Sequence, residues 1–280
     1  MTLKKSKNLS FYKMSALGND FVIFDFRKDY FKIPPRQIQV IADRKNIGCD
    51  QLIVIKSLDS SHSNDLPLFH LDSELIYEIE IYNRDGSRSG ACGNATRCVA
   101  GLLFEENPKK NNLKIKTLAG ILDCKKNSDG EISINMGKIK FLENFFYAHH
   151  NFYCANIGNP HAVCFIDQAI GDEEFFRVGP QVENHPNFPE KTNVEFAQIL
   201  ADDLIAVRVW ERGVGETSAC GSGACAVVAC AVKNNLVKSS QVIVKFSGGK
   251  LKINYNDTQI TMTGGYNKIF KGIIDEQLFL

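Results

Sequence analysis

Short hydrophobic runs alternate with turns rich in glycine, asparagine and aspartate along most of this chain. Runs of aromatic and β-branched residues bounded by such turns are typical of strands, and apolar residues at helical spacing are typical of helices. The pattern predicts strands at residues 21–26, 51–55, 75–82, 113–117, 132–136, 162–166, 204–209, 242–246 and 260–263. It predicts helices at 35–44, after Cys92, after Cys220 and, in a shorter amphipathic piece, after Gly171. Many strands with few helices predict an α/β fold of the α+β type.

Two segments look like one sequence used twice. GACGNATRCVAG at 90–101 and SACGSGACAVVA at 218–229 each place a cysteine before a glycine and a polar residue, and then continue as an apolar helix. A Gly-Asn turn and a strand ending in aspartate precede each segment, at 18–25 and 158–167. A methionine follows 44 residues after Cys92, as Met136, and 42 residues after Cys220, as Met262. The shared order indicates an internal duplication.

The duplication and the length of 280 residues predict two domains, each with its own core. Because the cysteine helices are apolar nearly all round, each half is expected to be a curved sheet, mixed and mostly antiparallel, around one central helix. The expected domains are residues 1–140, completed by 270–280, and residues 141–269. The active site is expected in the cleft between these pseudo-symmetric domains, where the N-termini of the two helices emerge.

Charge and hydropathy narrow the class of protein. The 33 basic and 32 acidic residues give a net charge of +1, and no long run of one sign suggests nucleic acid or an anionic membrane as a partner. The first ten residues lack the apolar core of a signal peptide, and the longest apolar run, 224–232, is too short to span a bilayer. These features predict a soluble cytoplasmic protein.

The cysteines divide into two groups. Nine is an odd number and no CxxC pair occurs, which argues against a disulfide scaffold and a zinc ribbon. At Cys92 and Cys220, a helix N-terminus would bind anions and lower the thiol pKa, so the pair is predicted to act as acid and base on opposite faces of one bound anion. The others are expected to be ordinary residues, mostly of the core: Cys49, Cys98, Cys124, Cys154, Cys164, Cys225 and Cys230.

Polar residues gather in four further segments. NIGCDQ carries Gln51, YNRDGSRSG carries Asn83, TNVEFAQI carries Asn193, and VWERGVGETSACGSG carries Glu211 and Arg212 just before the second cysteine. Amides and a charged pair suit an amino-acid zwitterion, and the arginine fork suits a carboxylate. The alternatives are turn residues bonded to local backbone and an ordinary ion pair at a strand end.

Six blocks of this sequence resemble the signature blocks of the diaminopimelate epimerase family, in order and over nearly the whole chain. They are GNDFVIFD, IGCDQ, NRDGSRSGACGNATRCVA, IGNPHAV, TNVEFAQI and VRVWERGVGETSACGSGACAVVA. The resemblance implies inversion at the α-carbon of LL-diaminopimelate to give the meso isomer, for lysine and peptidoglycan synthesis. It implies an isomerase that uses no cofactor, neither pyridoxal phosphate nor a metal, and that forms a homodimer.

The resemblance also implies roles for individual residues. Cys92 and Cys220 would be the two bases, with His161 and Glu211 as further catalytic residues. Phe270 would lie at the dimer interface, where the family often has a tyrosine, so the hydroxyl contact would be absent. The backbone amides of four residues would hold the reacting carboxylate: Gly93, Asn94, Gly221 and Ser222. The other residues around the substrate would be Asn19, Gln51, Asn83, Asn159, Asn193, Glu211 and Arg212.

Some positions depart from the family pattern, and two other functions stay open. Ala95 and Thr96 stand where the first cysteine block usually has glycine, and 60–72 is a polar insertion expected to be a loop. One alternative is a related two-cysteine racemase of a single-headed amino acid such as proline, which would need apolar walls in place of Arg212. The other is a noncatalytic thiol redox sensor or metal-binding protein, in which Cys92 and Cys220 could form a disulfide under oxidation. Cys49, at a variable position near Gln51, could be an additional site of oxidation in the enzyme.

Overall fold

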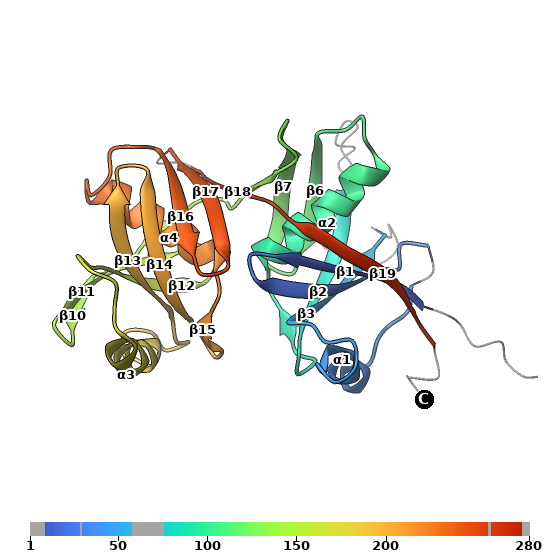
Figure 1. The fold of residues 1–280 in the computed structure, drawn as a ribbon, viewed down its shortest axis with the longest axis horizontal. Helices are drawn as coiled ribbons and strands as arrows, with labels where there is room; N and C mark the ends of the chain where they lie inside the picture. The colour runs from blue at the N-terminus through green and yellow to red at the C-terminus, as the bar shows by residue number, and fades with distance from the viewer. Residues whose placement is uncertain (1–8, 29, 58–75, 257–258, 276–280) are drawn as a thin grey trace, which may run out of the picture. The chain divides into compact units, whose positions relative to one another are not determined.

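The computed structural model describes residues 9–28, 30–57, 76–256 and 259–275, and it divides into two compact units (Figure 1). The first unit takes its residues from Met1–Ile132 and Gly265–Leu280, and the second is Ser133–Gly264. The polar insertion at 60–72 lies outside the described residues. The chain thus leaves the first unit once and returns to it with its last strand.

The first unit is a mixed sheet with two helices. Its strand order is β19–β1–β2–β3–β4–β6–β7, with β5 paired to β4. The β2–β3 and β4–β6 pairs are parallel, and the others are antiparallel. The elements are β1 (Leu9–Ala16), β2 (Asn19–Asp25), α1 (Pro35–Ala42), β3 (Gln51–Lys56), β4 (Ile76–Asn83), β5 (Arg88–Ser89), α2 (Gly93–Glu106), β6 (Asn112–Thr117), β7 (Gly120–Lys126) and β19 (Asn267–Ile274).

The second unit repeats this arrangement. Its strands run β10–β11–β12–β13–β14–β16–β17–β18–β8, with β9 also on β11 and β15 on β14. Again two pairs are parallel, β12–β13 and β14–β16. The elements are β8 (Ile132–Asn135), β9 (Lys140–Phe141), β10 (Phe145–Tyr147), β11 (His150–Asn156), β12 (Pro160–Phe165), α3 (Asp172–Glu183), β13 (Asn193–Ala201), β14 (Leu204–Glu211), β15 (Gly215–Thr217), α4 (Gly221–Lys233), β16 (Gln241–Phe246), β17 (Gly249–Tyr255) and β18 (Ile260–Gly264).

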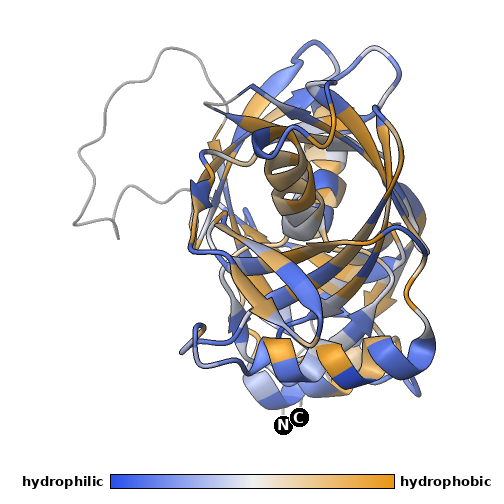
Figure 2. Cartoon of the chain, turned by 90° about the vertical axis from the view of Figure 1, so that its left-hand side faces the viewer, coloured by the Kyte–Doolittle hydropathy of each residue, from blue (hydrophilic) through white to orange (hydrophobic). Residues whose placement is uncertain are grey.

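One helix in each unit is buried on nearly every side. α2 packs against β1, β2, β3, β6 and β7, and α4 packs against β11, β12, β13, β16, β17 and β18. From Asn94 to Phe104 every residue of α2 is buried, and so is every residue of α4 from Gly223 to Ala231. Figure 2 views the second unit with α4 in the middle of its strands, coloured mostly as hydrophobic. The predicted sheet around a central apolar helix is therefore confirmed in each unit.

The other two helices are amphipathic and cover the outside of the sheets. Ile38 and Ile41 of α1 join a core cluster with strand residues such as Phe24 and Leu52. Phe175 and Val178 of α3 do the same in the second unit, and Figure 2 shows α3 with alternating hydrophobic and hydrophilic residues. Each sheet therefore has a central helix on one side and an amphipathic helix on the other.

The strands and helices predicted from the sequence are present, with ends that differ by at most two residues. Several strands were not predicted, including β1, β11, β13, β17 and β19. In β13, the sequence NVEFAQILA is apolar after its first residue, Asn193, except for Glu195 and Gln198. Glu195 is nevertheless fully buried. A buried acidic residue interrupts the hydrophobic pattern from which strands are predicted.

Candidate functional site

Each of the two matched cysteines is the N-cap residue of a central helix. The Cys92 Sγ accepts a hydrogen bond from the Ala95 N–H at 3.5 Å, at the start of α2. The Cys220 Sγ accepts one from the Gly223 N–H at 3.4 Å, at the start of α4. Residues at the first turn of a helix keep N–H groups without an intrahelical acceptor. These ends are therefore suited to bind an anion next to a thiol.

Burial changes the acidity expected for one of these thiols. The helix N-terminus was predicted to lower the cysteine pKa, and for Cys220 this prediction is wrong. Burial raises its pKa well above the usual value, and the nearby negative charges of Glu211 and Glu195 raise it further. The Ser222 hydroxyl and the Gly223 N–H act in the opposite direction but do not compensate. These surroundings therefore favour the neutral thiol of Cys220.

In the first unit, amide side chains from separate segments bond to one another. The Asn94 Nδ2, in the first turn of α2, donates to the Asn19 Oδ1 at 2.7 Å. The Gln51 Nε2, at the start of β3, donates to the Asn83 Oδ1 at the end of β4, at 3.0 Å. The tertiary structure therefore brings the predicted polar residues of this unit together in two pairs. Cys92 and Gly93 precede Asn94 on the same turn.

A buried arginine donates a hydrogen bond to the side-chain amide of Asn94. Arg97 is fully buried in α2, and its Nη2 donates to the Asn94 Oδ1 at 2.7 Å. The guanidinium therefore occupies the carbonyl oxygen and leaves the Nδ2 to donate to Asn19. Sequence analysis did not assign Arg97 a role, although an arginine within an apolar helix is the signal that could have indicated one.

In the second unit, four hydrogen bonds connect a buried acid to the cysteine through three side chains. The Glu195 Oε1 lies 2.7 Å from the His161 Nδ1, and the His161 Nε2 lies 3.1 Å from the Asn159 Oδ1. The Asn159 Nδ2 donates to the Ser222 Oγ at 3.4 Å, and this hydroxyl lies 3.5 Å from the Cys220 Sγ. Three predicted residues therefore lie in one network with the thiol. Glu195 completes the network and was not predicted.

Asn193, another predicted residue of this unit, hydrogen-bonds to the backbone of Arg212 and of Pro160. The Asn193 Oδ1 accepts from the Arg212 backbone N–H at 3.1 Å, and its Nδ2 donates to the Pro160 carbonyl at 2.9 Å. The exposed Arg212 side chain donates from Nη1 to the Glu190 carbonyl at 3.1 Å. Within the described part of the chain, Arg212 forms no ion pair with Glu211. The guanidinium keeps most of its donors available.

Glu211 faces the second cysteine and not its sequence neighbour. Burial raises the Glu211 pKa, while hydrogen bonds from Thr217 and Cys220 lower it in part. The Thr217 hydroxyl donates to the Glu211 Oε1. An acid with a raised pKa beside a thiol can exchange a proton with it, as general acid–base chemistry requires.

Sequence comparisons identify the relatives of this chain. The family model for diaminopimelate epimerase matches residues 11–142 and 153–269. A diaminopimelate epimerase of Rhodospirillum centenum is 37% identical over 285 residues, covering 96% of this chain and 93% of the relative. One of Pelagibacter ubique is 38% identical over 279 residues, covering 92% of this chain and 96% of the relative.

The chain belongs to the diaminopimelate epimerase family. Solved structures with the same fold include proteins of other families. A hydroxyproline epimerase from Agrobacterium vitis, with bound trans-4-hydroxy-L-proline, has a TM-score of 0.69 at 13% identity and covers 98% of this chain and 94% of that one. A PhzF-family phenazine biosynthesis protein of Bacillus anthracis has a TM-score of 0.68 at 15% identity, covering 96% and 99%. At these identities the likeness concerns the fold.

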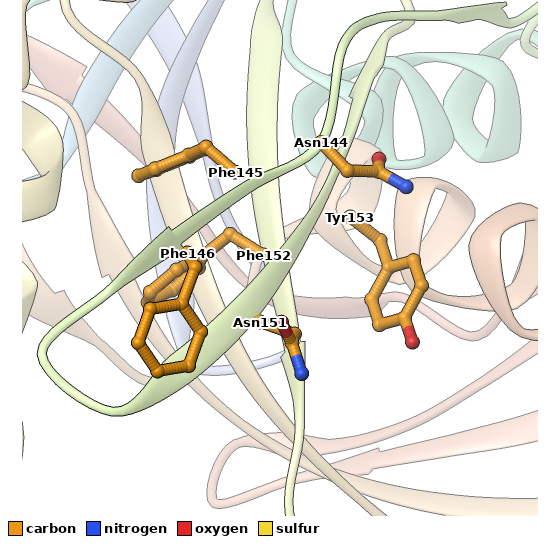
Figure 3. A pocket seen from close by; sticks show the side chains of 6 residues that line it. All are labelled: Asn144, Phe145, Phe146, Asn151, Phe152 and Tyr153. Carbon is orange, nitrogen blue, oxygen red and sulfur yellow. The ribbon is translucent and has the colours of Figure 1, made fainter.

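Membership of this family makes the chain an isomerase. A separate pocket of about 410 Å³ lies at the β10–β11 hairpin and holds none of the predicted site residues (Figure 3). It is lined by Asn144, Phe145, Phe146, Asn151, Phe152 and Tyr153. None of the helices in the described ranges has the length and apolar character that a membrane crossing requires.

Proposed function

We propose that this member of the family is a diaminopimelate epimerase that converts LL-diaminopimelate to the meso isomer with Cys92 and Cys220 as base and acid. The observation that carries the proposal is the matched position of the two thiols, each capping a buried helix whose first amides are available to an anion. The reaction needs no cofactor in this proposal, and pyridoxal phosphate is not used. It would serve lysine and peptidoglycan synthesis.

The proposed chemistry is one proton removal and one proton delivery. A thiolate takes the α-proton on one face, leaving the electron pair of the C–H bond on the α-carbon as a carbanion. The thiol of the other cysteine gives its proton to the opposite face, so the configuration inverts and the two sulfurs exchange protonation states. Since an α-proton is far less acidic than a thiol, the carbanion needs stabilisation by the amides of Gly93, Asn94, Gly221 and Ser222.

The proposed assignment of the other residues follows their hydrogen bonding. Glu211 and His161 act beside the Cys220 thiol, the first in contact with it and the second through Asn159 and Ser222. Asn19, Asn83 and Asn193 present amides to the substrate, together with Gln51. Arg212, exposed and held through its backbone by Asn193, binds the distal carboxylate.

We further propose a cytoplasmic homodimer. None of the nine cysteines, all of them in the described residues, forms a disulfide bond, which suits a reducing compartment. The dimer is proposed to form through β19, which exposes Ile269, Phe270 and Ile273 to 53%, 48% and 69% of their surface. Three large apolar residues exposed along one strand favour a protein interface.

The experiment that tests the function is proton NMR of α-proton exchange in D2O. Reduced, chelator-treated protein is offered LL-diaminopimelate and, in a separate sample, L-proline. We expect loss of the α-proton signal of diaminopimelate together with appearance of the meso isomer. Exchange in proline alone would instead favour a single-headed amino-acid racemase, and exchange in neither would favour a redox or binding role.

A further inference from the structure

Glu195 is a buried acid whose position costs free energy. Its side chain is fully buried, and within the described residues its Oε2 has no hydrogen-bond partner. The Oε1 contacts the His161 Nδ1, which is also fully buried. Burying a carboxylate that is hydrogen-bonded at one oxygen costs free energy, unless the interaction with its partner compensates for the lost hydration. Such a residue is kept for a reason other than packing.

The duplicated half shows that the fold does not require a charge here. In the first unit, β2 pairs in parallel with β3, with Phe21 beside Gln51. In the second unit, β12 pairs in the same way with β13, with His161 beside Asn193. Counted from these pairs, His161 corresponds to Phe21 and Glu195 to Ile53. Phe21 and Ile53 are fully buried and apolar, so this sheet position is stable with a hydrophobic pair.

The first turn of α4 leaves room for the Glu195 carboxylate because residue 223 is a glycine. A Cβ added to Gly223 would lie 2.6 Å from the Glu195 Oε1, so a larger residue would displace the carboxylate. The same N–H group of Gly223 donates to the Cys220 Sγ. In the first unit, the residue three positions after Cys92 is Ala95, so an alanine matches Gly223 in the unit where Ile53 matches Glu195. The glycine and the acid therefore occur together in the unit that holds the histidine.

The network gives this acid a route to the thiol. The Glu195 carboxylate accepts from an N–H on Nδ1, and the Asn159 Oδ1, which can only accept, takes its hydrogen bond from Nε2, so both ring nitrogens of His161 donate and the ring orientation is fixed. Asn159 in turn bonds to Ser222, and Ser222 to Cys220. From this we infer that Glu195 is a positioning residue, which holds His161 with Nδ1 protonated and thereby orders the polar side chains around Cys220. The inference rests on the proposed function and adds a residue to it.

The first test is spectroscopic and does not depend on turnover. In protein labelled with 15N-histidine, long-range 1H–15N correlations report which ring nitrogens of each histidine carry a proton. The His161→Phe variant identifies the signals that belong to His161. The wild-type spectrum is expected to give a protonated Nδ1 for His161. Glu195→Ile, which installs the residue of the first unit, is expected to lose the Nδ1 proton of His161, whereas Glu195→Gln keeps an acceptor and should retain it. An unchanged His161 spectrum in Glu195→Ile would overturn the inference.

The second test is kinetic. Glu195→Ile is expected to lower kcat about 10- to 100-fold with little change in KM, as for other residues that orient an imidazole. Glu195→Gln should recover part of that loss, and Ile53→Val at the matched position of the first unit should leave kcat unchanged. A kcat of Glu195→Ile within about twofold of wild type would contradict the inference.

Two further results separate the possible failures. If Glu195→Ile does not fold, Gly223→Ala provides the spectroscopic test, because its Cβ would lie 2.6 Å from the Glu195 Oε1; it is not used for the kinetic test, because the same Cβ would lie 3.2 Å from the Cys220 Cβ. If wild-type protein does not act on LL-diaminopimelate, the proposed function fails, and the histidine spectra still decide whether Glu195 holds His161. Folding of the His161→Phe/Glu195→Ile double variant with a melting temperature at or above that of wild type is expected, and marked destabilisation would instead assign the pair a structural role.

Discussion

At the scale of single residues, the two thiols differ although their helix positions match. Both cap a helix through an N–H three residues later. Cys220 is 6% exposed and lies near Glu211 and Glu195, which together with burial favour its neutral form. The helix end alone would have favoured the thiolate. The local motif therefore determines where the sulfur lies, and its surroundings determine its charge.

Replacing either thiol tests the two-cysteine mechanism. Cys92→Ser and Cys220→Ser are each expected to lower kcat for epimerisation at least about 1,000-fold, because a hydroxyl is a much weaker acid than a thiol. The measurement is the rate of meso-diaminopimelate formation, with circular dichroism as the control for folding. Turnover near the wild-type rate in either variant would remove the mechanism.

Arg212 provides a test of substrate specificity. Arg212→Lys retains the charge but loses the forked geometry, so KM for diaminopimelate is expected to rise about tenfold or more with a smaller change in kcat. The Glu190 carbonyl that Arg212 contacts can accept from lysine as well, so the local structure should persist. An unchanged KM would assign Arg212 a structural role.

Asp20 provides a test of stability against pH. Burial alone would raise its pKa, but hydrogen bonds from Arg44 and Lys13 outweigh burial and lower the pKa to about 2. The unfolded value is about 3.9, so the ionised group stabilises the fold above about pH 4, and this stabilisation is lost as the pH falls toward 2.

The expected consequence is a pH-dependent effect of one substitution. Asp20→Asn should lower the free energy of unfolding by about 1 kcal/mol or more above pH 5, and the difference from wild type should shrink between pH 4 and 2. Urea unfolding across this range measures it. A difference that stays constant with pH would show that the Asp20 charge does not stabilise the fold.

At the scale of secondary-structure elements, the central helices are positioned by close contact as well as by hydrophobicity. Gly101 lies within α2, where a Cβ would come within 2.2 Å of the Tyr266 ring. A glycine within a helix costs about 1 kcal/mol relative to alanine, so close packing is the reason for its presence here. The helix and the segment before β19 approach each other because this side chain is absent.

A substitution at Gly101 sets these two effects against each other. Gly101→Ala is expected to destabilise the protein by about 1–3 kcal/mol despite the better helix propensity, because the ring must move. Gly101→Ala/Tyr266→Ala removes the clash and should be more stable than Tyr266→Ala alone. Thermal unfolding of the three variants measures both effects, and stabilisation by Gly101→Ala alone would contradict the packing argument.

At the scale of the whole molecule, the two units share a fold but differ in their polar cores. Each has the same order of parallel and antiparallel strand pairs and the same thiol-capped helix. The second unit places His161 and Glu195 where the first places Phe21 and Ile53. The two units are therefore similar scaffolds, and only the second has a buried acid and histidine at this sheet position.

The proposed assembly is tested at the same scale. Phe270→Asp places a charge on the exposed apolar strand and is expected to shift the protein from dimer to monomer in analytical ultracentrifugation. Lys271→Ser, on the same strand, is the matched control and should remain dimeric. A Phe270→Asp protein that stays dimeric would show that the interface lies elsewhere.

Much of this fold followed from local sequence patterns. Aromatic and β-branched runs located nine strands, and the caps at Cys92 and Cys220 located the central helices to the residue. The candidate residues on these caps, and on the Gly-Asn turns before β2 and β12, were predictable because their neighbours in sequence determine their geometry.

The sequence by itself determined the duplication, the positions of the two thiols and the family resemblance, since each depends on residues close together in the chain or on their order. Tertiary structure alone decided the partners of the polar groups, such as Glu195 with His161 and Arg97 with Asn94. It also decided the raised pKa of Cys220. Burial and hydrogen bonding depend on which distant segments fold together, and no local pattern records that.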